Sequence, residues 1–438
     1  MTAEDTLGRA PPAWLPGRTW YQLHALRAAA CAGTNPDAGA KTPTDRGFQR
    51  LQVWLDHVAG LGSGGVLLTP ISASMTHGYD TVDPLRVDQR LGDESDFEAF
   101  VDAAHALDLK VALDGVFNHV GRDFPRFRDV LARGRDSEYT DWFRLDFTRD
   151  EGDGFAYACF EGHRELVALN HDNDAVLDWA SEVARHWLER GADGWRFDAA
   201  YAMSPAFVAS LTERVLAQHP QAFMFGEMIH GDYAGFVTSS GLHSVTQYEL
   251  YKAIWSSLND ANLFELAWAL ERHDAFARVF VPVTFAGNHD VTRLHSILHD
   301  PSLVGPALAI LFTVPGTPCV YYGDELAWEG IKEQRAGGDD AIRPPLPRDP
   351  TPAGDEQERV LQLHRELIAL RRARPWLTTA HIDVVEVANQ RITYTVAAGS
   401  NALLVTLDVG ASPLVPPPGG WQPIASGAGW LVCERAAA

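Results

Sequence analysis

The ten residues GWRFDAAYAM, at positions 194–203, alternate bulky apolar side chains with charged ones. Successive side chains of a β-strand point to opposite faces, so Trp195 and Phe197 share one face while Arg196 and Asp198 share the other. If both faces of such a strand are covered, the arginine and the aspartate enter the protein interior together. Taken alone, this pair is more often a structural ion pair than part of a functional site.

Seven other short runs of β-branched or aromatic residues stand beside helical patterns. Together with the first, they give expected strands at residues 21–23, 65–69, 111–117, 194–198, 223–227, 244–246, 283–286 and 319–322. Strands that alternate with helices in this way predict an α/β protein with a (β/α)8 TIM barrel. A doubly wound open sheet is the alternative architecture.

Two further parts accompany the predicted barrel. The connection after the third strand, residues 121–172, is too long for an ordinary barrel loop, so we expect a short inserted subdomain there. This insertion divides the barrel into residues 1–120 and 173–375. Residues 376–438 contain short strands and turns and are expected to form a small C-terminal β-sandwich domain.

The composition limits the kinds of molecule that the protein is expected to bind. The 438-residue chain is 46% hydrophobic and has a formal net charge of −22, which repels nucleic acid and anionic membrane surfaces but not neutral molecules. It has no apolar run of signal-peptide or membrane-spanning type, and its four cysteines are scattered without CxxC spacing. We therefore expect a cytoplasmic protein with reduced thiols and a small neutral substrate, while the oligomeric state stays open.

Polar side chains follow four of the predicted strands at their C-terminal ends. The set consists of Asp114, Asn118 and His119 in DGVFNHV, Arg196 and Asp198 in GWRFD, Glu227 in FGEM, and His289 and Asp290 in FAGNHD. In a (β/α)8 barrel these ends meet at one mouth, where active sites lie. Three carboxylates gathered around a neutral substrate suit glycoside hydrolysis, in which one attacks the sugar carbon, one transfers the proton and one stabilises positive charge.

Two environments are expected to separate the roles of the carboxylates. Arg196 on the same strand face should lower the pKa of Asp198 and keep this nucleophile ionised. Glu227 is expected to carry the proton because its neighbours are carboxylates. Two alternative interpretations stay open. Glu227 could cap a helix. Asp114, His119 and His289 could form a zinc site, although no HxH or HExxH spacing supports one.

The four motifs, in this order, resemble those of the α-amylase superfamily of retaining α-glycosidases, glycoside hydrolase family 13. The resemblance covers the chain to about residue 374 and implies that residues 121–172 correspond to the family's domain B. It also implies roles for the strand-end residues: Asp198 is the nucleophile, Glu227 the general acid/base and Asp290 the transition-state stabiliser. Arg196 then orients Asp198, while His119 and His289 bind the sugar at the cleavage position.

Three further segments resemble the family and one departs from it. HGYDTVDPLRVDQRLG implies that Tyr79 stacks on the bound sugar and that Asp80 braces the site. GGDDAIR implies that Asp339 and Arg343 hold the next sugar on the non-reducing side. Many amylases carry Lys-His shortly after the nucleophile, where this chain has Tyr201 and Ala202, so we expect a different and aromatic leaving-group site.

The family's structural calcium site is only partly represented. Asn118 is retained, but LVALN at residues 166–170 has Ala168 where some members have a calcium-ligating aspartate. Since calcium needs six or more oxygen ligands, Asp114 and Asn118 are interpreted as structural residues that could contribute to a metal site. We expect no required cofactor and leave structural calcium as an open alternative.

The resemblance implies a retaining α-glucoside hydrolase that cleaves short α-linked gluco-oligosaccharides of malto-oligosaccharide type. Cleavage would proceed through a covalent β-glycosyl-enzyme on Asp198, with Glu227 as acid/base. A transglycosylase with the same three carboxylates, such as a glucanotransferase or a sucrose- or trehalose-active enzyme, is the alternative. A non-catalytic sugar-binding relative is a remote one, because such proteins lose carboxylates that this chain retains.

Overall fold

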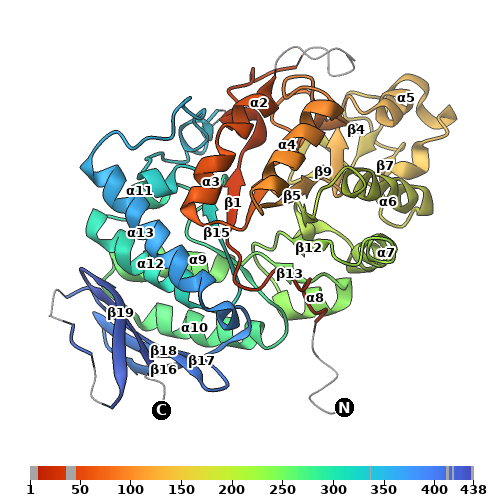
Figure 1. Ribbon diagram of the computed structural model, residues 1–438. Coiled ribbons are helices and arrows are strands. Elements are labelled where there is room, and N and C mark those ends of the chain that lie inside the picture. The colour runs from red at the N-terminus through yellow and green to blue at the C-terminus, as the bar shows by residue number, and fades with distance from the viewer. Residues whose placement is uncertain (1–7, 36–45, 336, 411–413, 417–418, 436–438) are drawn as a thin grey trace.

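The computed structural model describes residues 8–35, 46–335, 337–410, 414–416 and 419–435 (Figure 1). Eight parallel strands form its central sheet, each within three residues of its predicted position. They are β1 (Trp20–Leu23), β2 (Gly65–Leu68), β5 (Lys110–Gly115), β11 (Gly194–Phe197), β12 (Phe223–Gly226), β13 (Ser244–Val245), β14 (Val283–Phe285) and β15 (Thr317–Tyr321). The (β/α)8 barrel is confirmed.

The strands follow one another around the barrel in chain order. Hydrogen-bonded neighbours run β13-β12-β11-β5-β2-β1-β15-β14. The circle closes between β13 and β14 through a parallel bridge from Thr246 to Val283. We call this junction the seam. Closure excludes the open-sheet alternative.

Both faces of β11 are buried, and the alternation of side chains sends the charged face of GWRFD inward. Trp195 packs outside the barrel, where its indole nitrogen donates to the carbonyl of Ala184 at 3.1 Å. Arg196 therefore faces the barrel interior. Below it the interior is filled by large rings, with Trp20 stacked on Phe223 at 6.1 Å between centroids. The apolar layer closes the bottom of the barrel and leaves the polar layer at the C-terminal end.

Helices cover the outside of the barrel, and several begin at side-chain caps. The longer ones are α4 (Glu94–Ala106), α6 (Asp174–Leu188), α7 (Pro205–Leu216), α8 (Tyr233–Ser240), α9 (Tyr248–Asn259), α10 (Phe264–Ala277), α12 (Val304–Thr313) and α13 (Asp355–Arg372). Short helices are α1 (Ala25–Ala28), α2 (Gly47–Gln52), α3 (Leu55–Leu61) and α11 (Leu294–Ile297). A capping box between Asp93 and Asp96 starts α4, and Asn173 caps α6. No helix in the described ranges is long and apolar enough to cross a membrane.

Small sheets and one helix occupy the long connection after β5. A three-stranded antiparallel sheet joins β6 (His119–Gly121), β10 (His163–Ala168) and β9 (Cys159–Phe160), and a two-stranded sheet joins β7 (Leu145–Asp146) and β8 (Ala156–Tyr157). Helix α5 (Pro125–Arg133) packs beside them. The strands β3 (Ser72–Ser74) and β4 (Thr81–Val87) form another hairpin after β2.

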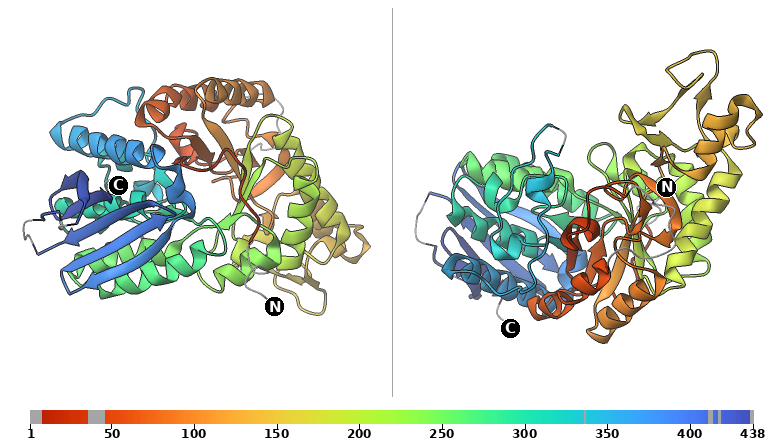
Figure 2. Two further views of the ribbon diagram at one scale, coloured as in Figure 1. Left: turned by 60° about the horizontal axis from the view of Figure 1, so that its bottom comes forward. Right: turned by 90° about the horizontal axis from the view of Figure 1, so that it is seen from above.

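The C-terminal segment forms one five-stranded antiparallel sheet, ordered β16-β17-β18-β20-β19. Its strands are β16 (His381–Val387), β17 (Arg391–Ala398), β18 (Asn401–Asp408), β19 (Trp421–Gly427) and β20 (Trp430–Arg435). A C-terminal β domain was expected, but the layer facing this sheet is made of α10 and α12 rather than a second sheet. Tyr394 of the sheet, for example, bonds Thr313 at the end of α12 at 2.9 Å. This sheet and α5 lie on opposite sides of the barrel (Figures 1 and 2).

Candidate active site

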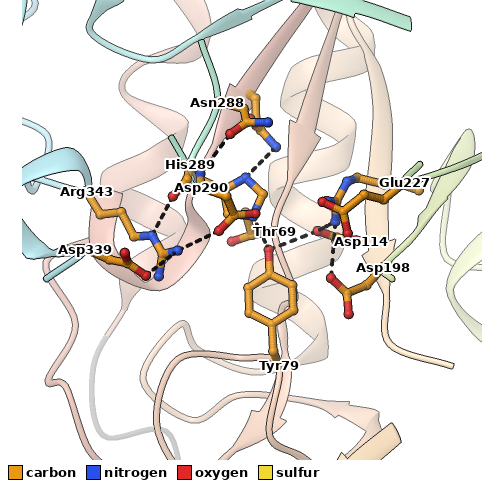
Figure 3. Close-up of polar contacts among 12 residues, drawn as sticks. Thr69, Tyr79, Asp114, Asp198, Glu227, Asn288, His289, Asp290, Asp339 and Arg343 are labelled. Atoms are coloured by element: carbon orange, nitrogen blue, oxygen red, sulfur yellow. Dashed lines mark hydrogen bonds and ion pairs between the residues drawn. The ribbon is translucent and has the colours of Figure 1, made fainter. Parts of the chain in front are cut away.

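The C-terminal ends of the barrel strands open into a cavity of about 580 Å³. Eight of the predicted site residues line it: Tyr79, His119, Asp198, Tyr201, Glu227, Asp290, Asp339 and Arg343. The predicted residues Asp80, Asp114, Asn118, Arg196 and His289 do not line this cavity. Three carboxylates from different strand ends therefore face one space, as the strand-end pattern predicted (Figure 3).

Arg196 lies under the cavity and is shared by three carboxylates. Its Nη1 lies 2.5 Å from Asp114 Oδ2 and 3.6 Å from Asp198 Oδ1, and its Nη2 lies 2.7 Å from Glu227 Oε1. The side chain is 3% exposed. Burial disfavours its charge, but Asp114 and Glu227 outweigh burial and hold the pKa of Arg196 well above its usual value.

Arg196 lowers the pKa of Asp198 as expected, but the prediction that this keeps the pKa of Asp198 low is wrong. Burial, Glu227 and Asp114 raise the pKa of Asp198 well above its ordinary value, and Arg196 offsets only part of this rise. The reason is geometric, because the guanidinium makes its two short contacts with Asp114 and Glu227 and only a longer one with Asp198. Burial likewise raises the pKa of Asp114, to about 6.

Glu227 is held by donors rather than surrounded by carboxylates alone. Its Oε1 forms an ion pair with Arg196 Nη2 at 2.7 Å and accepts from the Tyr248 hydroxyl at 3.2 Å. Its Oε2 accepts from the backbone N–H of Ala199 at 3.0 Å. Ala199 has φ 47°, in the left-handed region that non-glycine residues rarely adopt, so the turn after β11 aims this N–H at the carboxylate.

Asp290 is held on the other side of the cavity by Arg343 and His289 (Figure 3). Its Oδ1 lies 2.8 Å from Arg343 Nη2, and its Oδ2 lies 3.0 Å from His289 Nε2. The same Arg343 nitrogen lies 2.9 Å from Asp339, which fixes the guanidinium. Burial disfavours the charged carboxylate, but His289 and Arg343 outweigh it and hold the pKa of Asp290 well below its usual range. Asp290 is therefore a stable negative charge.

Tyr79 reaches between the two sides of the cavity (Figure 3). Its hydroxyl donates to Asp114 Oδ2 at 3.1 Å and lies 2.5 Å from His289 Nε2. Gln22 donates to His289 Nδ1 at 3.0 Å, which leaves Nε2 as the protonated nitrogen. Burial lowers the pKa of His289 to about 3, so the ring is neutral and acts as a hydrogen-bond donor.

His119 presents an unused donor to the cavity. Asn118 Nδ2 lies 3.2 Å from His119 Nδ1, while Nε2 has no hydrogen-bond partner among the described residues. The ring stacks on Phe160 with centroids 4.8 Å apart. Burial lowers the pKa of His119 to about 3, so the ring is neutral. A buried ring held on both sides with one free nitrogen can bind a hydroxyl oxygen.

Asp80 lies behind the cavity rather than in its lining. Its Oδ2 accepts from Thr76 Oγ1 at 2.7 Å, and its Oδ1 lies 3.8 Å from His77 Nδ1. His77 itself lines the cavity. Asp80 thus contacts the loop that carries Tyr79 and His77.

Tyr201 forms a bridge across one wall of the cavity. Its hydroxyl donates to Glu161 Oε1 at 2.8 Å, and Glu161 stands at the tip of the tight turn between β9 and β10. Both Glu161 and Gly162 have positive φ, 48° and 82°, as a two-residue hairpin turn requires. Behind this Tyr201–Glu161 bridge lies a second cavity of about 470 Å³.

The second cavity does not fit a calcium ion. Ala168 has no side-chain oxygen, Glu161 is the one carboxylate among the residues that line the space, and the cationic Arg144 also lines it. Calcium requires six or more oxygen ligands, whereas a guanidinium repels a cation. Across the described ranges, no group of three or more His, Cys, Asp or Glu side chains could hold a metal, and the zinc alternative from Asp114, His119 and His289 fails for this reason.

Several site residues were missed in the sequence. Tyr248 follows the very short strand β13 and contacts Glu227, a position that the strand-end rule could have indicated. Asn288 donates to the Tyr248 hydroxyl at 2.8 Å. Lys332 donates to the carbonyl of Asp290 at 2.9 Å and lines the cavity. No local pattern marks Lys332, because it reaches the site from a loop without regular structure.

Comparison with known proteins agrees with this geometry. The family model for the alpha amylase catalytic domain matches residues 49–380. A maltogenic alpha-amylase of Bacillus acidopullulyticus is 31% identical over 392 residues, covering 84% of this chain and 64% of that protein. An intracellular maltogenic amylase of Bacillus subtilis is 28% identical, covering 85% and 64%. The chain thus spans just under two-thirds of the length of both relatives.

A similar solved structure matches over nearly its whole length. This protein, the cyclic alpha-maltosyl-(1→6)-maltose hydrolase of Arthrobacter globiformis, is 25% identical. The TM-score is 0.78, and the match covers 91% of this chain and 92% of that one.

Proposed function

Because the chain belongs to the α-amylase family, we propose that it is a retaining α-glucoside hydrolase that cleaves short α-linked gluco-oligosaccharides. The observation that carries this proposal is the convergence of Asp198, Glu227 and Asp290 on one cavity. The names of the maltogenic relatives and of the cyclic oligosaccharide hydrolase support short or cyclic malto-oligosaccharides as substrates.

In the first step, Asp198 attacks the anomeric carbon and forms a β-glycosyl-enzyme. The bond from that carbon to the leaving oxygen breaks, and Glu227 gives its proton to this oxygen. Positive charge develops on the sugar at the same moment. Asp290 stabilises it, because its depressed pKa keeps it ionised beside the reacting ring.

In the second step, water enters on the side that the leaving sugar has vacated. Glu227, now ionised, takes a proton from this water, and the oxygen of the water attacks the anomeric carbon. The bond to Asp198 breaks, its carboxylate is restored, and Glu227 is again protonated. Two inversions give a product with the α configuration.

Neutral donors and ring faces bind the sugar in this proposal. The unpartnered Nε2 of His119 binds a hydroxyl, and the Tyr79 ring forms the face beneath the sugar while His289 holds the Tyr79 hydroxyl. Arg343 and Asp339 are placed to bind the next sugar on the non-reducing side. Tyr201 faces the leaving sugar across the Tyr201–Glu161 bridge. Asp80, Asp114 and Arg196 act from beneath by holding these groups in place.

We also propose a cytoplasmic location. One relative is an intracellular maltogenic amylase, and the cysteines Cys31, Cys159, Cys319 and Cys433 are all free thiols. Free thiols suit a reducing compartment.

The test is incubation of the purified chain with maltose, maltotriose, isomaltose, trehalose, sucrose and soluble starch, with products resolved over time. We expect malto-oligosaccharides to be cleaved, with the α anomer of the new reducing end appearing first by NMR. Asp198→Asn and Glu227→Gln should lower kcat by about 10⁴-fold. Undiminished turnover in either variant contradicts the assignment, initial β product contradicts retention, and products longer than the substrate indicate transfer.

A further inference from the structure

A chain of three hydrogen bonds links the two segments that carry Glu227 and Asp290. The backbone N–H of Asp290 donates to Asn288 Oδ1 at 2.8 Å, and Asn288 Nδ2 donates to the Tyr248 hydroxyl at 2.8 Å. The Tyr248 hydroxyl then donates to Glu227 Oε1 at 3.2 Å. We call this chain the Asn288–Tyr248 relay. Its order fixes the direction of each bond, because the Asn288 amide supplies the donor that the tyrosine oxygen accepts.

The relay makes the two oxygens of Glu227 different. Oε1 accepts from the Tyr248 hydroxyl and lies 2.7 Å from Nη2 of the Arg196 guanidinium in an ion pair, whereas Oε2 accepts only from the neutral backbone N–H of Ala199. A proton on a carboxyl oxygen that faces both a hydroxyl donor and a guanidinium is disfavoured. The proton of the neutral acid therefore belongs on Oε2.

We propose that Tyr248, oriented by Asn288, is a positioning residue for the acid/base: it anchors Oε1 of Glu227 and so directs the transferable proton to Oε2. This inference rests on the proposed role of Glu227. It adds a residue that acts through Glu227 rather than on the substrate bond itself.

The surroundings of Tyr248 allow the hydroxyl to be removed without disturbing the ring. The ring packs edge-on against Phe285 with centroids 4.8 Å apart, and that contact does not involve the hydroxyl. Tyr251, one turn later on α9, also packs on Phe285, at 5.1 Å. Among the described contacts, no hydrogen bond joins Tyr251 to the carboxylate cluster. Tyr251→Phe is thus a matched control for Tyr248→Phe.

Charged groups reach Glu227 from several elements besides α9. Arg196 comes from β11, Asp198 and the Ala199 N–H from the turn after it, and Asp114 from β5. Asp290 follows β14. Since Tyr248→Phe changes none of these charges, a selective loss on the substrate that needs a proton reports on the lost hydrogen bond.

The experiment compares two substrates in the wild type, Tyr248→Phe, Asn288→Ala and Tyr251→Phe. Maltotriose needs a proton on its leaving sugar, whereas α-maltosyl fluoride releases fluoride without one. For Tyr248→Phe we expect kcat/KM on maltotriose to fall about 10-fold. On α-maltosyl fluoride the fall should be less than about threefold. Asn288→Ala should show the same selectivity with a smaller loss, and Tyr251→Phe should match the wild type.

The split between kcat and KM supplies the second readout. A positioning residue acts on the proton-transfer step, so kcat on maltotriose should fall in Tyr248→Phe while KM stays within about twofold of the wild type. Equal losses on both substrates, or a loss carried by KM alone, overturn the positioning role. If the wild type cleaves neither substrate, the proposed function itself fails, which is a separate outcome.

Discussion

Arg196 and Arg371 are buried to nearly the same extent at opposite ends of the barrel, with 2% and 0% exposure. Arg196 lies at the C-terminal end among Asp114, Asp198 and Glu227. Arg371 extends from α13 to the N-terminal end, where it donates to the carbonyls of Phe312, Val314 and Gly316. Carbonyl oxygens surround the Arg371 guanidinium, and carboxyl oxygens surround the Arg196 guanidinium.

The difference appears in their proton affinities. Burial alone lowers the pKa of Arg371 to about 9, whereas the carboxylates hold the pKa of Arg196 well above its usual value in spite of burial. Arg371 serves the fold, because the carbonyls at the end of α12 are the unsatisfied groups of a helix C-terminus. Arg196 holds together negative charges that would otherwise repel one another. The same side chain thus stabilises backbone at one end and prepares chemistry at the other.

The largest effect is expected when the guanidinium is removed from the three carboxyl groups. Arg196→Met leaves Asp114, Asp198 and Glu227 buried without a shared positive charge. We expect kcat on maltotriose to fall by about 10³-fold or more. The free energy of unfolding should fall by about 3–5 kcal/mol. Denaturant unfolding and initial rates below the melting temperature measure the two effects, and a variant that keeps wild-type kcat contradicts the role given to Arg196.

The matched change at the other end should separate stability from activity. Arg371→Met leaves backbone carbonyls without donors, which costs about 1–3 kcal/mol of the free energy of unfolding. No carboxylate of the active site changes partner, so kcat should stay within about twofold of the wild type. Urea unfolding and maltotriose turnover provide the measurements. A loss of activity as large as that of Arg196→Met would show that the two arginines are not functionally distinct.

The next test concerns the pH at which Asp198 gains a proton and kcat/KM falls. Only its carboxylate attacks, so kcat/KM falls as pH decreases through the pKa of Asp198, which is raised. The acidic limb should therefore lie above the pH of about 3.9 expected for an ordinary aspartate. Glu227 is the largest cause of this rise after burial, so in Glu227→Gln the limb should move to lower pH. Release of fluoride from α-maltosyl fluoride across pH measures both enzymes; a limb that stays in place contradicts the electrostatic coupling.

The smallest expected effect lies at the Tyr201–Glu161 bridge, away from both arginines. Tyr201→Phe keeps the ring and removes its 2.8 Å hydrogen bond to Glu161. The Tyr201 ring beside the leaving sugar is then no longer held in place, so KM for maltotriose should rise about threefold. Turnover of α-maltosyl fluoride should be unchanged, because this substrate has no leaving sugar. Steady-state kinetics with the two substrates provide the measurement. An equal effect on both would place the bridge outside the leaving side.

The barrel and the convergence of the carboxylates could be predicted because both depend on local information. Strand runs and their C-terminal residues are visible in the sequence, and a (β/α)8 barrel brings those ends together. The carboxyl groups that contact Arg196 could not be predicted from the sequence. They depend on the register that sets Arg196 beside Asp114 on the neighbouring strand, which no single strand specifies.

The other features that the sequence did not predict also depend on contacts between distant segments of the chain. Tyr248 contacts Glu227 only because β13 is two residues long and α9 begins almost at once. The Tyr201–Glu161 bridge depends on a hairpin 40 residues earlier in the chain reaching over the cavity. The C-terminal sheet faces helices rather than another sheet because α10 and α12 already supply an apolar layer. Local strand patterns predict each element, but not which element will cover it.

The seam between β13 and β14 runs through the proposed catalytic site. Glu227 and Tyr248 stand on one side, while Asn288, His289 and Asp290 stand on the other. Strands β13 and β14 pair through one bridge. The Asn288–Tyr248 hydrogen bond therefore adds a link across the seam at the mouth of the barrel. Loss of this contact would let Glu227 and Asp290, the proposed acid/base and the proposed stabiliser, move relative to each other across the seam.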